Sequence, residues 1–295
     1  MAGLKEIRIR IASVTSTRQI TNAMKMVSAS KLRKAHDAIL QLRPYAAKLQ
    51  EILTNVSDTL TSEEGNIYLR NKDPEKVLLV VITSNRGLCG AFNANIIRRT
   101  IQLIGEDYNN LYKSGNLDLF TIGKRGTDYL TRRKCKITDT RNDLFDGLNF
   151  KTATQVAEDL INRFITRRYD KIVLVYNQFK NAAVQILTTE QFLPVIIPAK
   201  KEISQIYQDY IFEPSKDFII NELIPKSLKI KFYKALIDSN ASEHGARMTA
   251  MHQATDNATE LIRDLKLNYN KARQASITKE LLEIVSGAEA LKSKR

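Results

Sequence analysis

The distribution of glycine constrains the fold of this chain more than any motif does. Eight of the 11 glycines lie between residues 65 and 147, whereas residues 4–64 contain none. Glycine costs about 1 kcal/mol in the interior of a helix, so a glycine-free segment favours a long helix and a cluster of glycines indicates turns. The sequence therefore predicts helical ends and a central region of shorter elements.

Residues 4–60 carry a seam of side chains that recurs in alternating steps of three and four residues. Thirteen of its seventeen positions are apolar, which is the pattern of a coiled-coil helix sustained over many turns. The seam positions are Leu4, Ile7, Ile11, Val14, Arg18, Thr21, Lys25, Ser28, Leu32, Ala35, Ile39, Leu42, Ala46, Leu49, Leu53, Val56 and Leu60.

The four polar positions of this seam are consecutive, from Arg18 to Ser28. Over the same stretch Ile20, Met24 and Val27 follow another face of the helix at helical spacing. The stretch either shifts the phase of the coiled coil or faces a different neighbour. Pro44 predicts a kink or a break further along the helix.

A second seam extends through the C-terminal region. Nine of its eleven positions are apolar, and they are Ile237, Ala241, His244, Met248, Met251, Thr255, Ala258, Ile262, Leu265, Tyr269 and Ala272. A continuous helix over 214–287 would be about 110 Å long and the N-terminal one about 80 Å, at 1.5 Å per residue. Pro225 predicts a kink near the start of the C-terminal helix.

Between the helices the sequence alternates strand-like and helix-like segments. Strands are predicted at 76–83, 117–123 and 171–179, helices at 92–113, 124–133 and 152–168, and a further strand, antiparallel at an edge, in AVQILTTEQFLPV. This alternation predicts a central Rossmann-like domain with a parallel sheet. The predicted domains are 1–60, a linker at 61–75, 76–205 and 206–295, and the fold class is α/β plus a long antiparallel coiled coil.

Two turns after predicted strands imitate phosphate-binding loops. TSNRGLCGAFN (83–93) joins a strand to a helix but lacks the pattern G-x-G-x-x-G, and TIGKRG (121–126) lacks the hydroxyl residue that follows the lysine of a P-loop. A plain strand-to-helix turn accounts for both better than nucleotide binding does. The three histidines and two cysteines have no metal-ligand spacing, so we expect neither a metal nor a cofactor nor a catalytic site.

The chain is strongly basic, with a formal net charge of +14. Residues 1–60 hold ten Lys and Arg against four Asp and Glu, which indicates either a solvated helix face or an acidic partner. Nucleic acid is a weaker candidate, since residues 1–44 contain no aromatic side chain for stacking on bases. The two cysteines and the absence of a signal sequence favour a reducing, cytoplasmic setting.

Both ends of the chain resemble one family. MAGLKEIRIRIASVTSTRQITNAMKMVSASKLRKA and ATDNATELIRDLKLNYNKARQASITKELLEIVSGAEAL are similar to the two ends of the γ subunits of F-type ATP synthases, and RGLCGAFN resembles that family's central motif. The resemblance implies a non-catalytic central-stalk rotor that couples ion flow to ATP synthesis and hydrolysis. Its implied partners are the ring of three α and three β subunits, the ε subunit and the c-ring, without nucleic acid. The implied location is peripheral, on the cytoplasmic side of a bacterial cell membrane.

The resemblance also implies which residues contact the ring. They are Met24, Lys25, Arg247, Arg273, Gln274, Thr278, Leu281, Leu282 and Val285. Asn85 stands where many relatives have an acidic residue, which leaves charge pairing at that position open. Two other hypotheses stay open at this point: a nucleotide-binding α/β enzyme and a basic coiled-coil protein that binds nucleic acid.

Overall fold

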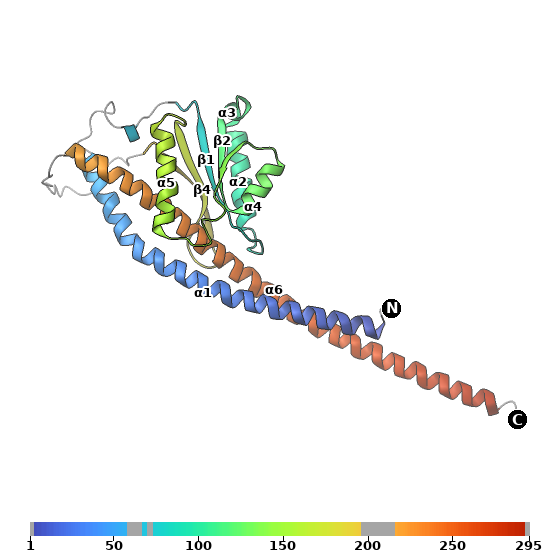
Figure 1. Ribbon diagram of the computed structural model, residues 1–295. Coiled ribbons are helices and arrows are strands. Elements are labelled where there is room, and N and C mark those ends of the chain that lie inside the picture. The colour runs from blue at the N-terminus through green and yellow to red at the C-terminus, as the bar shows by residue number, and fades with distance from the viewer. Residues whose placement is uncertain (1–2, 58–66, 70–72, 196–215, 293–295) are drawn as a thin grey trace. The chain divides into compact units, whose positions relative to one another are not determined.

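The computed structural model describes residues 3–57, 67–69, 73–195 and 216–292, which form two very long helices and a five-stranded α/β domain (Figure 1). Its contacts divide the chain into two compact units, residues 28–247 and residues 1–27 with 248–295. In chain order the elements are α1 (Leu4–Ser57), a 3-10 turn (Ile67–Leu69), β1 (Val77–Ile82), α2 (Phe92–Glu106), α3 (Asn109–Lys113), β2 (Leu117–Ile122), α4 (Lys124–Arg132), β3 (Ile137–Thr140), α5 (Phe150–Ile165), β4 (Lys171–Phe179), β5 (Gln185–Leu193) and α6 (Lys216–Lys292).

The sheet of the larger unit has the strand order β3-β2-β1-β4-β5. The first four strands are parallel, with Val77 of β1 in register with Leu117 of β2 and Lys171 of β4. Only β5 is antiparallel, and it pairs with β4 at one edge. The predicted parallel sheet with an antiparallel edge strand is therefore confirmed.

The central strand β1 explains the three-layer packing of this domain. All six of its residues are buried, as expected for a parallel strand covered on both faces. Leu78, Val80 and Ile82 pack on the side of α5 and the first half of α6, and the alternate residues pack on the side of α2 and α4. Each fully buried aliphatic side chain contributes about 1.5–3 kcal/mol, so this strand is the centre of the core.

The larger unit also holds the inner parts of both long helices against each other. Ala35 and Ile39 of α1 pack with Ile237 and Ala241 of α6, and Phe179 at the end of β4 closes the cluster. Because higher numbers in α1 meet lower numbers in α6, the two helices are antiparallel, as predicted.

Three local expectations need correction. The segment predicted as one helix over 92–113 forms two, α2 and α3, and the short strand β3 was not predicted. Of the kink or break predicted at Pro44, the break does not occur, because α1 continues to Ser57. Pro44 is exposed, and seam residues on both sides of it, Ile39 and Leu49, are buried, so packing compensates for the lost hydrogen bond.

The predicted domain boundaries fall partly outside the described residues. Most of the predicted linker (61–75) and the end of the predicted α/β domain lie in the ranges 58–66, 70–72 and 196–215. The division into 1–60, 61–75, 76–205 and 206–295 therefore stays a prediction.

Candidate functional site

The smaller unit pairs the N-terminal part of α1 with the C-terminal part of α6. Thr21 Oγ1 and Thr255 Oγ1 are 2.8 Å apart and share a hydrogen bond across the helix pair. On α6 the buried positions Met251, Ala258 and Ile262 follow the predicted seam. Apolar spacing and one polar contact together fix the register of this pair.

The polar part of the α1 seam keeps its phase. Arg18 and Lys25 are half-buried and Thr21 is buried, so the same face continues to meet α6. Ile20 and Val27 lie on another face and are 60% and 57% exposed. Met24, the third residue of that face, is half-buried. The seam therefore shows no shift of phase in this stretch, and a different neighbour for Ile20, Met24 and Val27 stays a prediction.

Among the described residues of its unit, 3–27 and 248–292, no helix lies beside the C-terminal end of α6 (Figure 1). Antiparallel pairing from Thr21 and Thr255 brings Leu4, the first residue of α1, opposite about residue 272. Every residue over 277–289 is exposed, which agrees with this register. The exposed large apolar side chains of this end are Ile277, Leu281, Leu282, Ile284 and Val285, at 45–68% exposure.

The structure gathers six of the nine predicted contact residues on this end of α6. Arg273, Gln274, Thr278, Leu281, Leu282 and Val285 are all exposed. Met24 and Lys25 are half-buried on α1, at the level of α6 residues near 251–255. At 1.5 Å per residue they are about 30 Å along the helix pair from Arg273.

Arg247, the ninth predicted contact residue, is only 7% exposed and is engaged inside the larger unit. Its guanidinium donates hydrogen bonds to the carbonyl oxygens of Arg86 at 3.2 Å and Gly87 at 3.2 Å. Its Nη1 is 2.7 Å from a carboxylate oxygen of Glu243 and 3.4 Å from Nδ1 of His244. Burial beside this cation lowers the pKa of His244 to about 4, so the imidazole is neutral and accepts the hydrogen bond.

Side-chain hydrogen bonds between Ser84 and Asn93 hold the turn after β1 together. The amide of Ser84 donates to Oδ1 of Asn93 at 2.9 Å, and Nδ2 of Asn93 donates to Oγ of Ser84 at 2.8 Å. The Ser84 hydroxyl donates to the carbonyl of Arg86 at 2.6 Å. Burial raises the pKa of the Cys89 thiol in the same turn. These bonds hold the turn in one conformation, and its sequence lacks the lysine and the third glycine of a phosphate-binding loop.

The second glycine-rich turn is explained by close packing against Thr83. Its Oγ1 accepts from the amide of Gly126 at 2.9 Å and lies 3.0 Å from the carbonyl oxygen of Gly123. A Cβ on Gly123, whose φ is +96°, would lie only 2.1 Å from the Thr83 carbonyl oxygen. These glycines therefore allow β1 and the start of α4 to approach closely.

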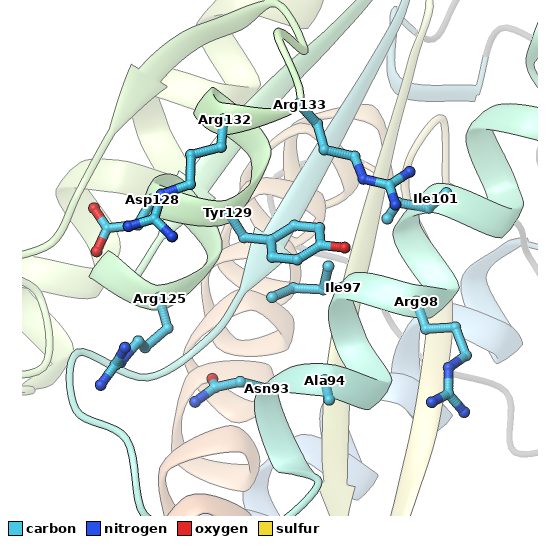
Figure 2. Close-up of a pocket in the computed structure, with 10 residues that line it drawn as sticks. All are labelled: Asn93, Ala94, Ile97, Arg98, Ile101, Arg125, Asp128, Tyr129, Arg132 and Arg133. Atoms are coloured by element: carbon cyan, nitrogen blue, oxygen red, sulfur yellow. The ribbon is translucent and has the colours of Figure 1, made fainter.

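A hollow of about 580 Å³ lies between α2 and α4 (Figure 2). Tyr129 occupies its centre, with Arg133 5.6 Å from the ring centroid. Figure 2 shows Arg125 and Arg132 directed to one side and Arg98 and Arg133 to the other. The four guanidinium groups do not converge, so this hollow is not built as a phosphate site.

The described residues contain neither a metal-binding cluster nor a membrane-spanning helix. Within residues 3–57, 67–69, 73–195 and 216–292, no three His, Cys, Asp or Glu side chains are grouped so as to hold a metal ion. Over the same residues, no helix combines the length and the hydropathy that a membrane span requires.

Comparison with known sequences identifies the family. A family model described as ATP synthase matches residues 3–291. The ATP synthase gamma chain of Flavobacterium johnsoniae is 58% identical over 291 residues, which cover 99% of each chain. Those of Cytophaga hutchinsonii and Chlorobaculum tepidum are 53% and 44% identical, and the matches cover 99% of this chain and 99% and 100% of theirs.

Comparison with solved structures supports the same fold. A chain from the central stalk and c-ring of the Tetrahymena thermophila mitochondrial ATP synthase is 26% identical with a TM-score of 0.58, and the match covers 80% of this chain and 99% of that one. A chain from the rotor of the Euglena gracilis mitochondrial ATP synthase is 22% identical with a TM-score of 0.67, covering 93% and 98%. Because the family model and the full-length relatives agree over nearly all residues, this chain belongs to the family of ATP synthase γ chains.

Proposed function

We propose that the chain is the rotor of the central stalk of an ATP synthase. It turns inside the ring of three α and three β subunits and transmits rotation from the membrane c-ring to that ring. Catalysis stays with the β subunits, and the γ chain supplies no catalytic group. Ion flow and ATP synthesis or hydrolysis are thus coupled through the stiffness and asymmetry of the shaft.

The unpaired end of α6 is the observation that carries this proposal. In this end α6 continues beyond its pairing with α1, and it exposes five large apolar side chains. Each such side chain would gain about 1.5–3 kcal/mol if fully buried, so a surrounding collar of protein suits this segment. The collar we propose is the top of the ring.

The proposed contacts lie on the exposed end of α6 and further along the two long helices. The residues proposed to face or influence the ring are Met24, Lys25, Arg247, Arg273, Gln274, Thr278, Leu281, Leu282 and Val285. Hydrogen bonds made during rotation must break at each step, and a net value of about 0.5–1.5 kcal/mol each suits that requirement. Lys25 is half-buried on α1, and the contact proposed for it is with acidic loops of the β subunits.

The α/β domain is proposed to bear on the ε subunit and the c-ring. This arrangement makes the chain peripheral to the membrane through its complex, on the cytoplasmic side of a bacterial cell membrane. The positive formal charge of +14 suits acidic protein partners.

The two other hypotheses are not favoured. For a nucleotide enzyme, the turn after β1 lacks a phosphate-binding sequence pattern, and the glycines of the next turn allow close packing against Thr83. The hypothesis of a nucleic-acid-binding protein rests on the basic N-terminal helix. Full-length similarity to ATP synthase γ chains favours a protein partner for that helix instead.

Copurification tests the proposal. A tag on the chain, expressed with the α and β subunits of the same organism, should recover an assembly that hydrolyses ATP, whereas the chain alone should show no hydrolysis. A Leu281→Ser/Leu282→Ser variant should be lost from the assembly more readily on dilution, because both side chains would leave their apolar collar. Recovery of the tagged chain only as a free monomer from gentle extracts would refute the proposal.

A further inference from the structure

The segment 241–247 is the longest unbroken run of buried residues over 222–289 of α6, and it follows a shorter one at 235–239. A surface helix normally buries one stripe and leaves the opposite face in water. Ala241 and Ser242 are fully buried, and Glu243, His244 and Arg247 are at least nine-tenths buried although all three are polar. The α/β domain and α1, whose Ala35 and Ile39 pack against Ala241, therefore enclose this part of α6 together.

Three separate parts of the domain make polar or close backbone contacts with the segment. The hydroxyl of Ser242 donates to the carbonyl of Asn177 in β4 at 3.0 Å. Gly245 lies against the β4–β5 turn, where an added Cβ would be 3.1 Å from the carbonyl oxygen of Ala182. Arg247 reaches the turn after β1 through its bonds to two carbonyl oxygens. The contacts are thus spread around the helix.

Arg247 is the charged centre of this enclosure. Its guanidinium and the carboxylate of Glu243 are 8% and 9% exposed as side chains, and they form a buried pair one helical turn apart. The guanidinium group is planar and carries its N–H donors in a fixed fork. This geometry allows it to donate hydrogen bonds to two carbonyl oxygens and a carboxylate at the same time. Removal of the cation alone would leave Glu243 buried without its partner, which is among the costliest changes in a protein interior.

The turn at 84–93, whose carbonyl groups accept hydrogen bonds from Arg247, is held by further hydrogen bonds of its own. Ser84 and Asn93 bond each other inside it, and Nδ2 of Asn85 donates to the carbonyl of Asn142 at 2.6 Å. Force applied to Arg247 therefore reaches β1 through a hydrogen-bonded turn. Residue 247 is also the last residue of the larger unit, and α6 continues without interruption into the smaller one.

We infer that the segment 241–247 is the anchor by which the α/β domain transmits torque to α6, with Arg247 as its positioning residue. This inference rests on the proposed rotor function and names the residues that make the link within this chain. Arg247 acts by holding the turn at 84–93 against α6, so its effect on rotation does not require it to touch another subunit.

The first test measures the anchor in the isolated chain. Hydrogen exchange is compared in the native chain, an Arg247→Met/Glu243→Gln variant that leaves no buried unpaired charge, and an Arg263→Met control on an exposed part of α6. Loss of one charge-assisted bond should speed exchange of the Ser84 and Phe92 amides by about 10- to 100-fold in the double variant only. Unchanged exchange at both amides would overturn the anchor.

The second test measures stiffness in the assembled complex. A probe fixed at Lys113→Cys on the exposed end of α3 reports angular fluctuation while rotation is stopped by a non-hydrolysable ATP analogue. We expect a wider angular distribution in the double variant, an intermediate one in Arg247→Lys, and the native one in Arg263→Met. A lysine supplies one point charge in place of the fork, which is why partial rescue is expected.

The outcomes separate this inference from the rotor proposal. If complexes assemble and rotate and the double variant has the native angular distribution, the anchor role is wrong and the rotor role stands. If the double variant does not assemble, the test uses complexes that contain Arg247→Lys. An angular distribution of the probe as narrow as in the native complex would then refute the anchor role. Failure of the native chain to assemble or rotate refutes the rotor proposal. Hydrogen exchange at the Ser84 and Phe92 amides of the isolated chain then still tests whether Arg247 holds the turn against α6.

Discussion

Replacement of Asp238 should stabilise the chain, and only at neutral and alkaline pH. Asp238 lies on α6 with 2% of its surface exposed. Burial is the main cause that raises its pKa from 3.8 to about 6; Lys234 of α6 and Arg43 of α1 oppose this, and Glu190 of β5 adds to it. The folded state therefore disfavours the charged carboxylate, and Asp238→Asn removes that penalty.

The magnitude follows from the two pKa values. A difference of about two pH units corresponds to about 3 kcal/mol, at about 1.4 kcal/mol per unit. Because the folded pKa is the higher one, the stabilisation from this group is complete below about pH 4 and is lost as the pH rises through about 6. The asparagine cannot ionise and loses nothing. We therefore expect the variant to exceed the native chain by up to about 3 kcal/mol at pH 8 and by little at pH 4.

Urea unfolding of both chains from pH 4 to pH 8 measures this difference. Asp264→Asn is the matched control, because Asp264 lies on the same helix and is exposed. Its difference from the native chain should stay within about 0.5 kcal/mol throughout. A difference for Asp238→Asn that does not change between pH 4 and pH 8 would refute the argument from burial.

Three further predictions concern the core, the helix pair and the exposed end. Gly123→Ala should cost about 2–5 kcal/mol in urea unfolding, whereas Gly115→Ala, also at positive φ but in open space, should cost about 1 kcal/mol; equal costs would contradict the role of Thr83. A double-mutant cycle of Thr21→Val and Thr255→Val should give a coupling of about 1 kcal/mol, and a value near zero would show that their 2.8 Å contact is not stabilising. Leu282→Ser should leave unfolding of the free chain within about 0.5 kcal/mol, whereas Ile262→Ser, at 8% exposure, should cost about 2–4 kcal/mol; comparable costs would mean that the end of α6 is covered in the free chain.

Periodicity made the long helices and the sheet predictable. The seam positions of α6 recur as buried or half-buried residues from Ile237 to Ala272, because regular spacing at helical period specifies one face. The run 77–82 could be predicted as a buried strand because its apolar and β-branched residues are continuous over the length of a strand. The short strand β3 could not, since its four residues are only partly buried and it pairs irregularly at the sheet edge.

The candidate site was predictable only in part. Leu281, Leu282 and Val285 are exposed because the C-terminal helix is longer than the N-terminal helix that pairs with it. The sequence predicts the lengths of both helices. The buried position of Arg247 has no local signal, because its partners Arg86 and Gly87 are 161 and 160 residues away. An alternating pattern of apolar residues locates a face of a helix, but contacts between distant segments depend on how the domain packs.

As a subunit of the central stalk, this chain should turn as the shaft of an ATP-driven motor. The most direct measurement is a single-molecule observation of a probe on the chain, in complexes whose α and β subunits are fixed to a surface. We predict that ATP makes the probe rotate continuously in one direction and that removal of ATP stops it. Complexes that hydrolyse ATP at their full rate while the probe stays at a fixed angle would contradict the account.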